Sequence, residues 1–156
     1  MKLRDLLAGV PLMGDSLDQE MEIFSISSDT RSIQPGALFA ALPGDKTDGH
    51  RYIQQALDKG AAAVVCQQPP EYPGPWLTAE DPRLAFALIS ANWFDRPGDG
   101  MTLVAVTGTN GKTTTTNLLK ELLERVKGAK VGLVGTNRNM IGAQELPAHR
   151  TTPDSF

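Results

Sequence analysis

The chain has 156 residues, of which 40% are hydrophobic and 21% are charged, and this balance is typical of a folded globular protein rather than a disordered one. The formal net charge of -3 at pH 7, without a run of Lys and Arg, argues against general nucleic-acid binding. The apolar runs are far shorter than a membrane span, and no long apolar segment follows the basic N-terminus, so we expect neither membrane insertion nor a signal peptide.

Short helical and strand patterns alternate through the first half of the chain. Apolar residues at helical spacing predict a short helix from Leu3 to Val10. Residues 23–26, 37–42 and 61–66 each have the apolar character of a strand. The last of these is a continuous apolar run, and we therefore expect it to be buried on both faces of a sheet.

The segment between the second and third of these strands predicts a helix. It is expected to begin at Asp48 or Gly49 and to end close to Gly60. The strand after it ends at Cys66, which is the only cysteine. A lone thiol excludes an internal disulfide and fits a reducing cytosol. We interpret Cys66 as a buried small hydrophobe, with a nucleophile as the alternative.

Proline-rich residues 67–75 are expected to form a loop, and residues 76–78 a further strand. Asp81 is a good N-cap, and Pro82 suits the first position of a helix that reaches about residue 94. The large aromatic residues of this region are expected in the core rather than on a base-stacking platform: Trp76, Trp93 and Phe94. Leu84, Leu88 and Ala91 are expected to share one apolar face of this helix.

Residues 95–100 break the periodicity and are the best candidate for a linker. An apolar strand is expected at 103–106, followed by a Gly-rich turn, a helix that ends at Gly128, and a strand at 130–134. Glu121 and Arg125 are spaced for an i,i+4 pair on this helix. Its apolar stripe is expected to consist of Leu118, Leu119, Leu122, Leu123 and Val126.

The turn between that strand and that helix has the composition of a phosphate-binding loop. Residues 107–114 read Thr-Gly-Thr-Asn-Gly-Lys-Thr-Thr. Glycines allow positive φ and leave backbone amides open to phosphate oxygens, while a helix start directs free N–H groups at the same point. We therefore expect this loop to bind the triphosphate of ATP through Gly108, Thr109, Asn110, Gly111, Lys112, Thr113 and Thr114.

Two side chains of the loop have specific predicted roles. Lys112 is the expected catalytic residue, with its ammonium between the terminal phosphates, and the Thr113 hydroxyl is the expected Mg²⁺ ligand. The match to the strict Walker A pattern is incomplete, because Val106 stands where that pattern has its first Gly. The alternative is an ordinary strand-to-helix turn in which the glycines serve only the backbone.

Four segments in order resemble the Mur ligase family, most closely its UDP-N-acetylmuramyl-tripeptide synthetases (MurE). They are Ser-Asp-Thr-Arg with the Pro-Gly-Ala-Leu-Phe-Ala-Ala-Leu-Pro-Gly run inside residues 28–44, Asp-Gly-His-Arg-Tyr-Ile at 48–53, the phosphate loop extended to 116, and Arg-Thr-Thr-Pro-Asp-Ser at 150–155. The loop alone is shared with folylpolyglutamate synthetases. The first and last segments narrow the resemblance to MurE.

The resemblance implies a cytoplasmic, ATP- and Mg²⁺-dependent ligase of peptidoglycan synthesis. Such enzymes join meso-diaminopimelate or L-lysine to UDP-MurNAc-L-Ala-D-Glu by way of an acyl phosphate, and the sequence does not distinguish the two amino acids. The implied fold is α/β. A small UDP-sugar-binding domain at residues 1–98 precedes the first βαβ unit of a P-loop-type parallel-sheet ATPase domain at 99–156. We expect no nucleic-acid partner and a monomer.

Carried over by position, the resemblance assigns two groups of substrate contacts. Ser28, Thr30, Asp45, Lys46 and Thr47 would contact the UDP-sugar, and Arg150, Thr151 and Thr152 would contact the muramoyl-peptide end. Simpler roles stay open for each group. The Ser28 turn could serve only to terminate a strand, residues 45–47 could be a solvated loop, and residues 151–152 could be an unstructured tail.

The remaining strands and the amino-acid-binding domain of such ligases would lie beyond residue 156. We therefore expect a fragment that is inactive alone. Two other classes remain open at this point: a stand-alone UDP-sugar-binding module formed by residues 1 to about 98, and a P-loop NTPase or kinase unrelated to Mur ligases. Separate titrations of UDP and ATP would distinguish them.

Overall fold

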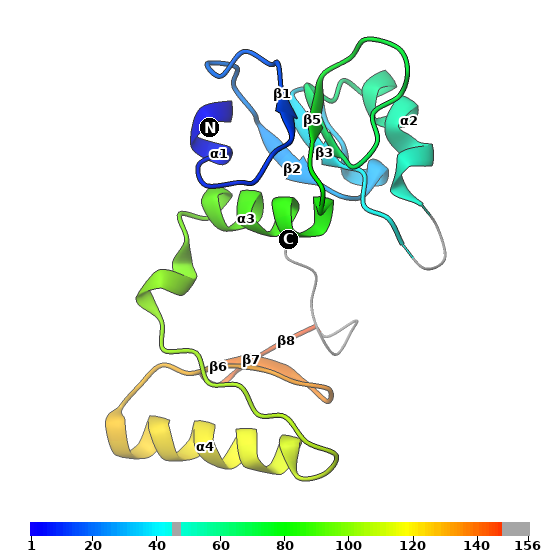
Figure 1. Ribbon diagram of the computed structural model, residues 1–156. Helices are drawn as coiled ribbons and strands as arrows, with labels where there is room; N and C mark the ends of the chain where they lie inside the picture. The colour runs from blue at the N-terminus through cyan, green and yellow to red at the C-terminus, as the bar shows by residue number, and fades with distance from the viewer. Residues whose placement is uncertain (45–47, 148–156) are drawn as a thin grey trace. The chain divides into compact units, whose positions relative to one another are not determined.

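The computed structural model describes residues 1–44 and 48–147. The chain divides into two compact units, one spanning Met1–Gly100 and one beginning at Met101. Both units combine helices with strands, and the first contains a mainly parallel sheet, which confirms the expected α/β class (Figure 1).

The first unit is built on a five-stranded sheet with the order β1-β5-β4-β3-β2. Strands β2 to β5 run parallel to one another, and β1 pairs antiparallel with β5 at one edge. The strands are β1 (Gly14–Asp15), β2 (Ser25–Ser27), β3 (Ala37–Ala40), β4 (Ala63–Cys66) and β5 (Trp76–Thr78). The predicted strands at 37–42, 61–66 and 76–78 are thereby confirmed, whereas the one expected at 23–26 begins two residues later.

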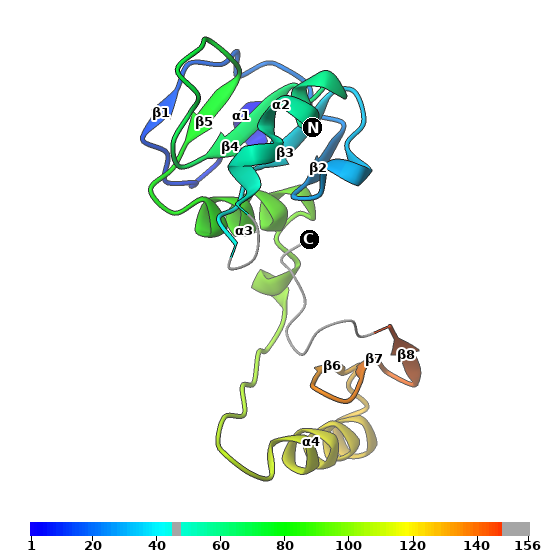
Figure 2. The ribbon, with the colours of Figure 1, turned by 90° about the vertical axis from the view of Figure 1, so that its right-hand side faces the viewer.

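Helices cover both faces of this sheet. Helices α1 (Leu3–Leu6) and α3 (Pro82–Trp93) pack on one face, and α2 (Ile53–Asp58) packs on the other. In Figure 2, α2 lies in front of the sheet and α1 behind it. Short 3-10 helices are η1 (Thr30–Ser32), η2 (Gly49–Tyr52) and η3 (Pro97–Gly100).

Alternate residues of the central strands pack into the two hydrophobic layers on opposite faces of the sheet. In β3, Leu38 and Ala40 belong to the cluster with α1 and α3, while Ala37 and Phe39 belong to the cluster with α2. All four are essentially inaccessible to solvent. A parallel strand between two helical layers is apolar at every position, which is why these runs do not alternate with polar residues.

Cys66 confirms its predicted role as a buried small hydrophobe. Its side chain is fully buried in the layer beneath α2, and burial raises the pKa of the thiol to about 11. At neutral pH the thiol therefore stays protonated and unreactive, which argues against the nucleophile alternative.

The predicted start of α3 is also confirmed. The Asp81 carboxylate accepts hydrogen bonds from the backbone amides of Arg83 (2.9 Å) and Leu84 (3.1 Å), and Pro82 occupies the first turn. The side chain thereby satisfies two amides that have no acceptor within the helix.

The face of α3 that enters the core is not the apolar face that begins at Leu84. Leu84 is 48% exposed, and the residues that enter the core are Ala85, Phe86 and Ile89. Asn92 lies on the same side, where its amide donates to the backbone oxygens of Leu6 (2.8 Å) and Ala8 (2.9 Å). The expectation for Phe94 is wrong, because it is 55% exposed, while Trp76 and Trp93 are partly buried against the core.

As far as residue 147, the second unit consists of α4 (Lys112–Lys127) and a three-stranded antiparallel sheet. Helix α4 ends at Gly128, whose φ of +62° provides the left-handed C-cap expected there. The predicted pair on α4 is formed, with Arg125 Nη2 2.6 Å from Glu121 Oε1. The strands, in spatial order, are β6 (Gly132–Val134), β7 (Asn139–Ile141) and β8 (Gln144–Leu146).

The strand predicted at 103–106 is not formed. Within the described chain, β6 pairs antiparallel with β7 and not with this run, so the expected βαβ unit lacks its parallel ladder. Leu103 and Val104 are 81% and 61% exposed. A strand needs a hydrogen-bonded neighbour, and apolar character alone does not supply one. The predicted stripe of α4 is likewise largely exposed at Leu118, Leu122 and Val126.

No helix in the described parts of the chain is both long enough and apolar enough to cross a membrane.

Candidate functional site

The loop before α4 has the backbone geometry of an anion cradle. Gly108 and Gly111 have φ values of +144° and +78°, a region that other residues rarely adopt. The first helical hydrogen bond runs from Thr115 N to Gly111 O (2.9 Å). The amides of Lys112, Thr113 and Thr114 precede this bond and have no acceptor within the helix. Gly111, the N-cap, has no side chain to cap them, so these amides and the positive end of the helix dipole are available to an anion.

Lys112 lies over this loop and not in the protein interior. Its ammonium donates hydrogen bonds to the backbone oxygens of Gly108 (2.6 Å) and Thr109 (3.4 Å). The side chain is exposed, and no carboxylate among residues 101–147 pairs with it. Because its acceptors are neutral carbonyls, the ammonium is available to the negative charge of a phosphate.

A cleft of about 230 Å³ opens beside the start of α4. It lies between the first two turns of the helix and the turn that joins β6 to β7. Its lining consists of Val106, Lys112, Thr113, Thr116, Asn117, Leu133, Val134, Gly135, Thr136, Asn137 and Arg138. The cleft brings together two of the predicted loop residues, Lys112 and Thr113, while Gly108, Thr109, Asn110, Gly111 and Thr114 form the adjoining turn and the exposed helix start.

Thr113 can supply one hydroxyl ligand to a magnesium ion but does not form a complete metal site. Its residue is exposed at the cleft, but the cleft lining includes no Asp or Glu, and the described residues contain no acidic or His/Cys cluster that could hold a metal by itself. Mg²⁺ usually keeps several waters and takes ligands from substrate phosphates. The donor set therefore fits Mg²⁺ that arrives with a nucleotide.

Among the polar residues of this cleft that sequence reasoning missed are Asn117 and Arg138, which form a hydrogen bond with each other. The Asn117 amide donates to Thr113 O (2.7 Å), and Arg138 Nη2 donates to Asn117 Oδ1 (2.7 Å). Asn117 stands four residues after Thr113, so the i,i+4 spacing on α4 was the available signal. Arg138 carries no such signal, because only the folded β6–β7 turn brings it to α4.

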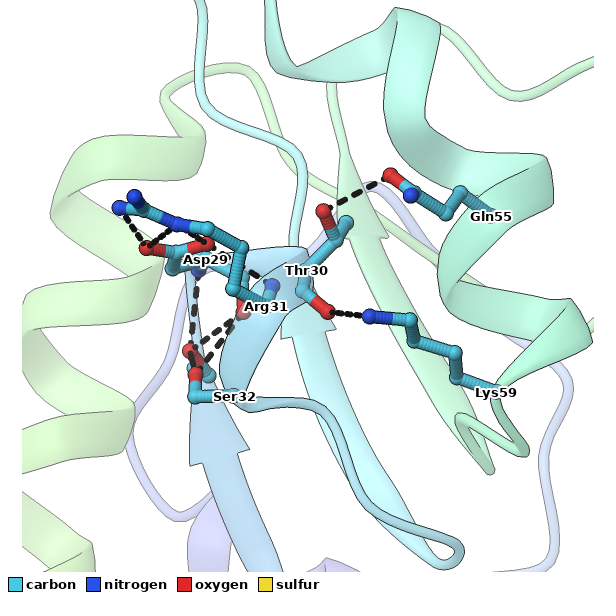
Figure 3. A network of polar contacts seen from close by, with 7 residues as sticks. Asp29, Thr30, Arg31, Ser32, Gln55 and Lys59 are labelled. Atoms are coloured by element: carbon cyan, nitrogen blue, oxygen red, sulfur yellow. Dashed lines mark hydrogen bonds and ion pairs between the residues drawn. The ribbon is translucent and has the colours of Figure 1, made fainter.

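In the first unit, a hydrogen-bonded turn follows β2 at the carboxyl edge of the sheet (Figure 3). Ser27 Oγ accepts a hydrogen bond from Asp29 N (2.9 Å) and lies 2.7 Å from Ser32 Oγ, which donates to Asp29 O (2.9 Å). The Asp29 carboxylate accepts from Arg31 N (2.9 Å) and from Arg31 Nε and Nη2. Hydrogen bonding from the Arg31 side chain lowers the pKa of Asp29 to about 2.

Thr30 is held inside this turn. It is 8% exposed, its hydroxyl donates to Gln55 Oε1 (2.9 Å), and its backbone oxygen accepts from Lys59 Nζ (2.6 Å), as Figure 3 shows. These bonds join η1 to α2 and its C-terminal end. Ser28, by contrast, has an exposed side chain. The predicted contacts of Ser28 and Thr30 with a UDP-sugar remain predictions.

A hollow of about 420 Å³ lies where β3 and β4 end. One wall is His50, whose Nδ1 is 2.7 Å from Asp48 Oδ1 and whose Nε2 accepts from the amides of Gln67 (3.2 Å) and Gln68 (3.4 Å). The backbone amide of His50 also bonds to Asp48, and this hydrogen bond is the main cause of the lowered pKa of the Asp48 carboxyl. The lining comprises Pro43, Asp48, His50, Ile53, Gln67, Gln68, Pro69 and Pro70.

Six predicted substrate residues lie outside the described part of the chain: Asp45, Lys46, Thr47, Arg150, Thr151 and Thr152.

Two family models match the chain. The model described as Mur ligase family, catalytic domain, matches residues 22–91, and the model of the Mur ligase middle domain matches residues 106–156. The first match contains the Ser28 turn and the hollow at the carboxyl ends of β3 and β4. The second contains the phosphate loop and the cleft beside α4.

Two curated relatives with similar sequences carry the same name. A UDP-N-acetylmuramoyl-L-alanyl-D-glutamate--2,6-diaminopimelate ligase of Chlorobium phaeobacteroides is 40% identical over 99% of this chain, and one of Caldanaerobacter subterraneus is 43% identical over all of it. The chain spans about a third of their length, 31% and 32% respectively.

Solved structures agree on the fold. A structure of a UDP-N-acetylmuramoyl-L-alanyl-D-glutamate--2,6-diaminopimelate ligase matches 99% of this chain with a TM-score of 0.75 and 24% identity, over 31% of its own length. MurF ligase from Thermotoga maritima, solved in complex with ADP, matches 65% of this chain with a TM-score of 0.51 and 28% identity, over 23% of its own length.

Proposed function

Because the chain belongs to the Mur ligase family, we propose that it forms the sugar-nucleotide-binding and phosphate-binding parts of an ATP-dependent ligase of peptidoglycan synthesis. The ligase would join a diamino acid to UDP-MurNAc-L-Ala-D-Glu. We take that amino acid to be 2,6-diaminopimelate, because the curated relatives at 40% and 43% identity carry it in their names.

The observation that carries the proposal is the position of the Lys112 ammonium over the loop. It lies 2.6 Å from Gly108 O, beside three helix-start amides that have no acceptor within the helix. A nucleotide phosphate entering here would replace the loop carbonyls as acceptor of the ammonium and would also bind the amides. Charge-assisted hydrogen bonds of this kind are about twice as strong as neutral ones.

The proposed chemistry needs little from the protein beyond positioning and charge. A carboxylate resists attack by an amine until one of its oxygens has become a phosphate leaving group. Lys112 and the amides of the loop would stabilise the charge on the transferring phosphoryl group, and the Thr113 hydroxyl would be a ligand of Mg²⁺ that arrives with ATP. Bound Mg²⁺ would neutralise phosphate charge during this transfer.

The sugar nucleotide would bind to the first unit, at the edge where the parallel strands end. Ligands of open α/β sheets bind outside the carboxyl ends of the strands. Ser28 follows β2, Pro43 lies just beyond β3, and Gln67 follows β4, and two of these residues line the 420 Å³ hollow. The exposed side chain of Ser28 supports a direct contact, whereas the buried hydroxyl of Thr30 supports a role in holding the turn.

We place the reaction in the cytoplasm, with the protein as a monomer. The single cysteine is buried as a free thiol, which suits a reducing compartment.

Separate titrations of the full chain with MgATP and with UDP-MurNAc-L-Ala-D-Glu, followed by calorimetry, test the proposal. We expect both ligands to bind, each with one site. Binding of MgATP alone would instead favour a phosphate-loop NTPase unrelated to Mur ligases. Binding of the UDP-sugar alone, surviving deletion of residues 99–156, would favour a stand-alone UDP-sugar module.

A further inference from the structure

We propose that Arg138 is a second phosphate-binding cation of the nucleotide site and contacts the terminal phosphate of ATP. It comes from the β6–β7 turn and lies outside the Gly-rich loop. Arg138 and Lys112 both line the 230 Å³ cleft beside the start of α4, so the cleft holds a cation on each of two opposing elements.

The position of Arg138 in the cleft is fixed by a chain of hydrogen bonds. Arg138 Nη2 donates to Asn117 Oδ1 (2.7 Å), and Asn117 Nδ2 donates to Thr113 O (2.7 Å). Asn117 therefore joins the guanidinium to the first turn of α4, which carries the amides expected to bind phosphate. The single bond to Asn117 leaves the other four N–H groups of the guanidinium available.

The charge of Arg138 is not neutralised by the protein. Its acceptor is a neutral amide, and no carboxylate among residues 101–147 forms an ion pair with it. The acidic residues on the nearby helix are paired elsewhere, Glu121 with Arg125 and Glu124 with Lys120. The cleft lining likewise contains no acidic residue. Two uncompensated cations facing one hollow select for a ligand with several negative charges.

The guanidinium of Arg138 favours a phosphoryl group over a monoatomic anion. The guanidinium is planar and presents donors in a fixed fork, which matches two oxygens of one phosphate. The loop glycines lie at the start of α4 and not in the cleft lining, whereas Lys112 and Arg138 both line the cleft. We therefore assign the inner phosphates to the loop amides and the terminal phosphate to the two cations.

This inference rests on the proposed function, and its test separates the two. We compare the affinities for MgATP and MgADP of the unmodified full chain and of Arg138→Gln, which keeps a polar side chain without the charge. The expected result is a loss of about tenfold or more in MgATP affinity and a change of less than about twofold for MgADP. The matched control is Arg125→Gln, which removes an exposed cation of the same unit that is not part of the cleft.

Circular dichroism of each variant shows whether it remains folded, and Arg138→Lys supplies a second variant that keeps the charge. We expect the Lys variant to bind MgATP with intermediate affinity, because the fork is lost and the charge remains. Equal losses for MgATP and MgADP in Arg138→Gln, or no loss in either variant, would overturn the assignment. If the unmodified chain binds neither nucleotide, the proposed function itself fails.

Discussion

Gly111 has a φ of +78° immediately before α4, and an added Cβ would meet no atom within 4 Å. The space around it is open, so only the backbone conformation requires glycine. The same holds for Gly108, whose φ is +144° and whose nearest atom to an added Cβ is Asn110 O at 3.8 Å. The loop therefore depends on glycine for its shape and for unobstructed amides.

From this we predict the effect of Gly111→Ala. A left-handed conformation costs a residue with a Cβ about 1–2 kcal/mol, so we expect a loss of stability of this size and weaker nucleotide binding. Chemical denaturation and calorimetry with MgATP measure the two effects. Gly132→Ala is the matched control, because Gly132 lies in the same unit without a positive φ or a close neighbour. Equal effects of the two substitutions would contradict this account.

Asp29 provides a pH-dependent prediction. Because Arg31 lowers the carboxyl pKa from 3.8 to about 2 in the folded state, the charged form stabilises the turn above the higher value. This contribution is lost as pH falls from 3.8 towards 2. Its size is limited, because Arg31 is almost fully exposed to solvent.

Carbon-detected NMR of the Asp29 carboxyl across this pH range measures the shift. In Arg31→Gln we expect the pKa to return most of the way towards 3.8, because the first cause of the shift is removed while the backbone bond remains. An Asp29 carboxyl that titrates near 3.8 in the unmodified chain would contradict the hydrogen-bonding pattern of the turn.

The location of the phosphate loop could be predicted from the sequence, because an anion-binding loop needs glycine, Lys and a hydroxyl residue close together in the chain. Arg138 could not be predicted in the same way. It lies 26 residues after Lys112, and only the turn between β6 and β7 brings the two to one cleft. The packing of Thr30 could not be predicted either, because its hydroxyl donates to Gln55, which lies 25 residues further along the chain.

Helix α3 shows which features of a helix can be predicted from its local sequence and which depend on the rest of the fold. Its N-cap and first proline were predictable because capping is a property of adjacent residues. Its buried face was not, because residues 84–89 are apolar all round the helix and define two possible stripes. The position of α1 decides between them, since Asn92 bonds to the backbone oxygens of Leu6 and Ala8.

A pair of substitutions tests the orientation of α3. Ile89 is fully buried, so Ile89→Ala should cost about 2–5 kcal/mol of stability. Leu84 is 48% exposed, so Leu84→Ala should cost under about 1 kcal/mol. Urea denaturation followed by circular dichroism measures both. A larger loss for Leu84→Ala than for Ile89→Ala would mean that the helix is turned the other way.

The run at 103–106 shows a different limit of sequence reasoning. Its apolar residues predicted a strand, but a strand is defined by a hydrogen-bonded neighbour, and in the described chain β6 pairs with β7 instead. Periodicity reports which side chains favour burial and carries no information on which strand is adjacent.

For the whole molecule, the two units differ in how completely their apolar surface is covered. Among residues 1–44 and 48–147, nearly all the fully buried hydrophobic residues belong to the first unit, whose sheet is covered by helices on both faces. In the second unit, Leu103, Leu118, Leu122, Val126 and Val134 are each more than half exposed.

We therefore predict that residues 1–100 fold as an independent unit. A polypeptide of this length should give a dispersed amide NMR spectrum and one cooperative thermal transition, because both layers of its core are contained within it. A collapsed spectrum without a transition would show that the first unit depends on the remainder of the chain.

We propose that glycine-flanked amides and the Lys112 ammonium together bind the phosphates of a nucleotide. Calorimetric titration of MgATP into the full chain and into Lys112→Ala tests it most directly, with Lys130→Ala as a control for the loss of one exposed positive charge. Hydrogen bonds to charged groups contribute about 1.5–3 kcal/mol, so Lys112→Ala should weaken binding by roughly tenfold or more, and Lys130→Ala should not. An unchanged MgATP affinity in Lys112→Ala would contradict the account.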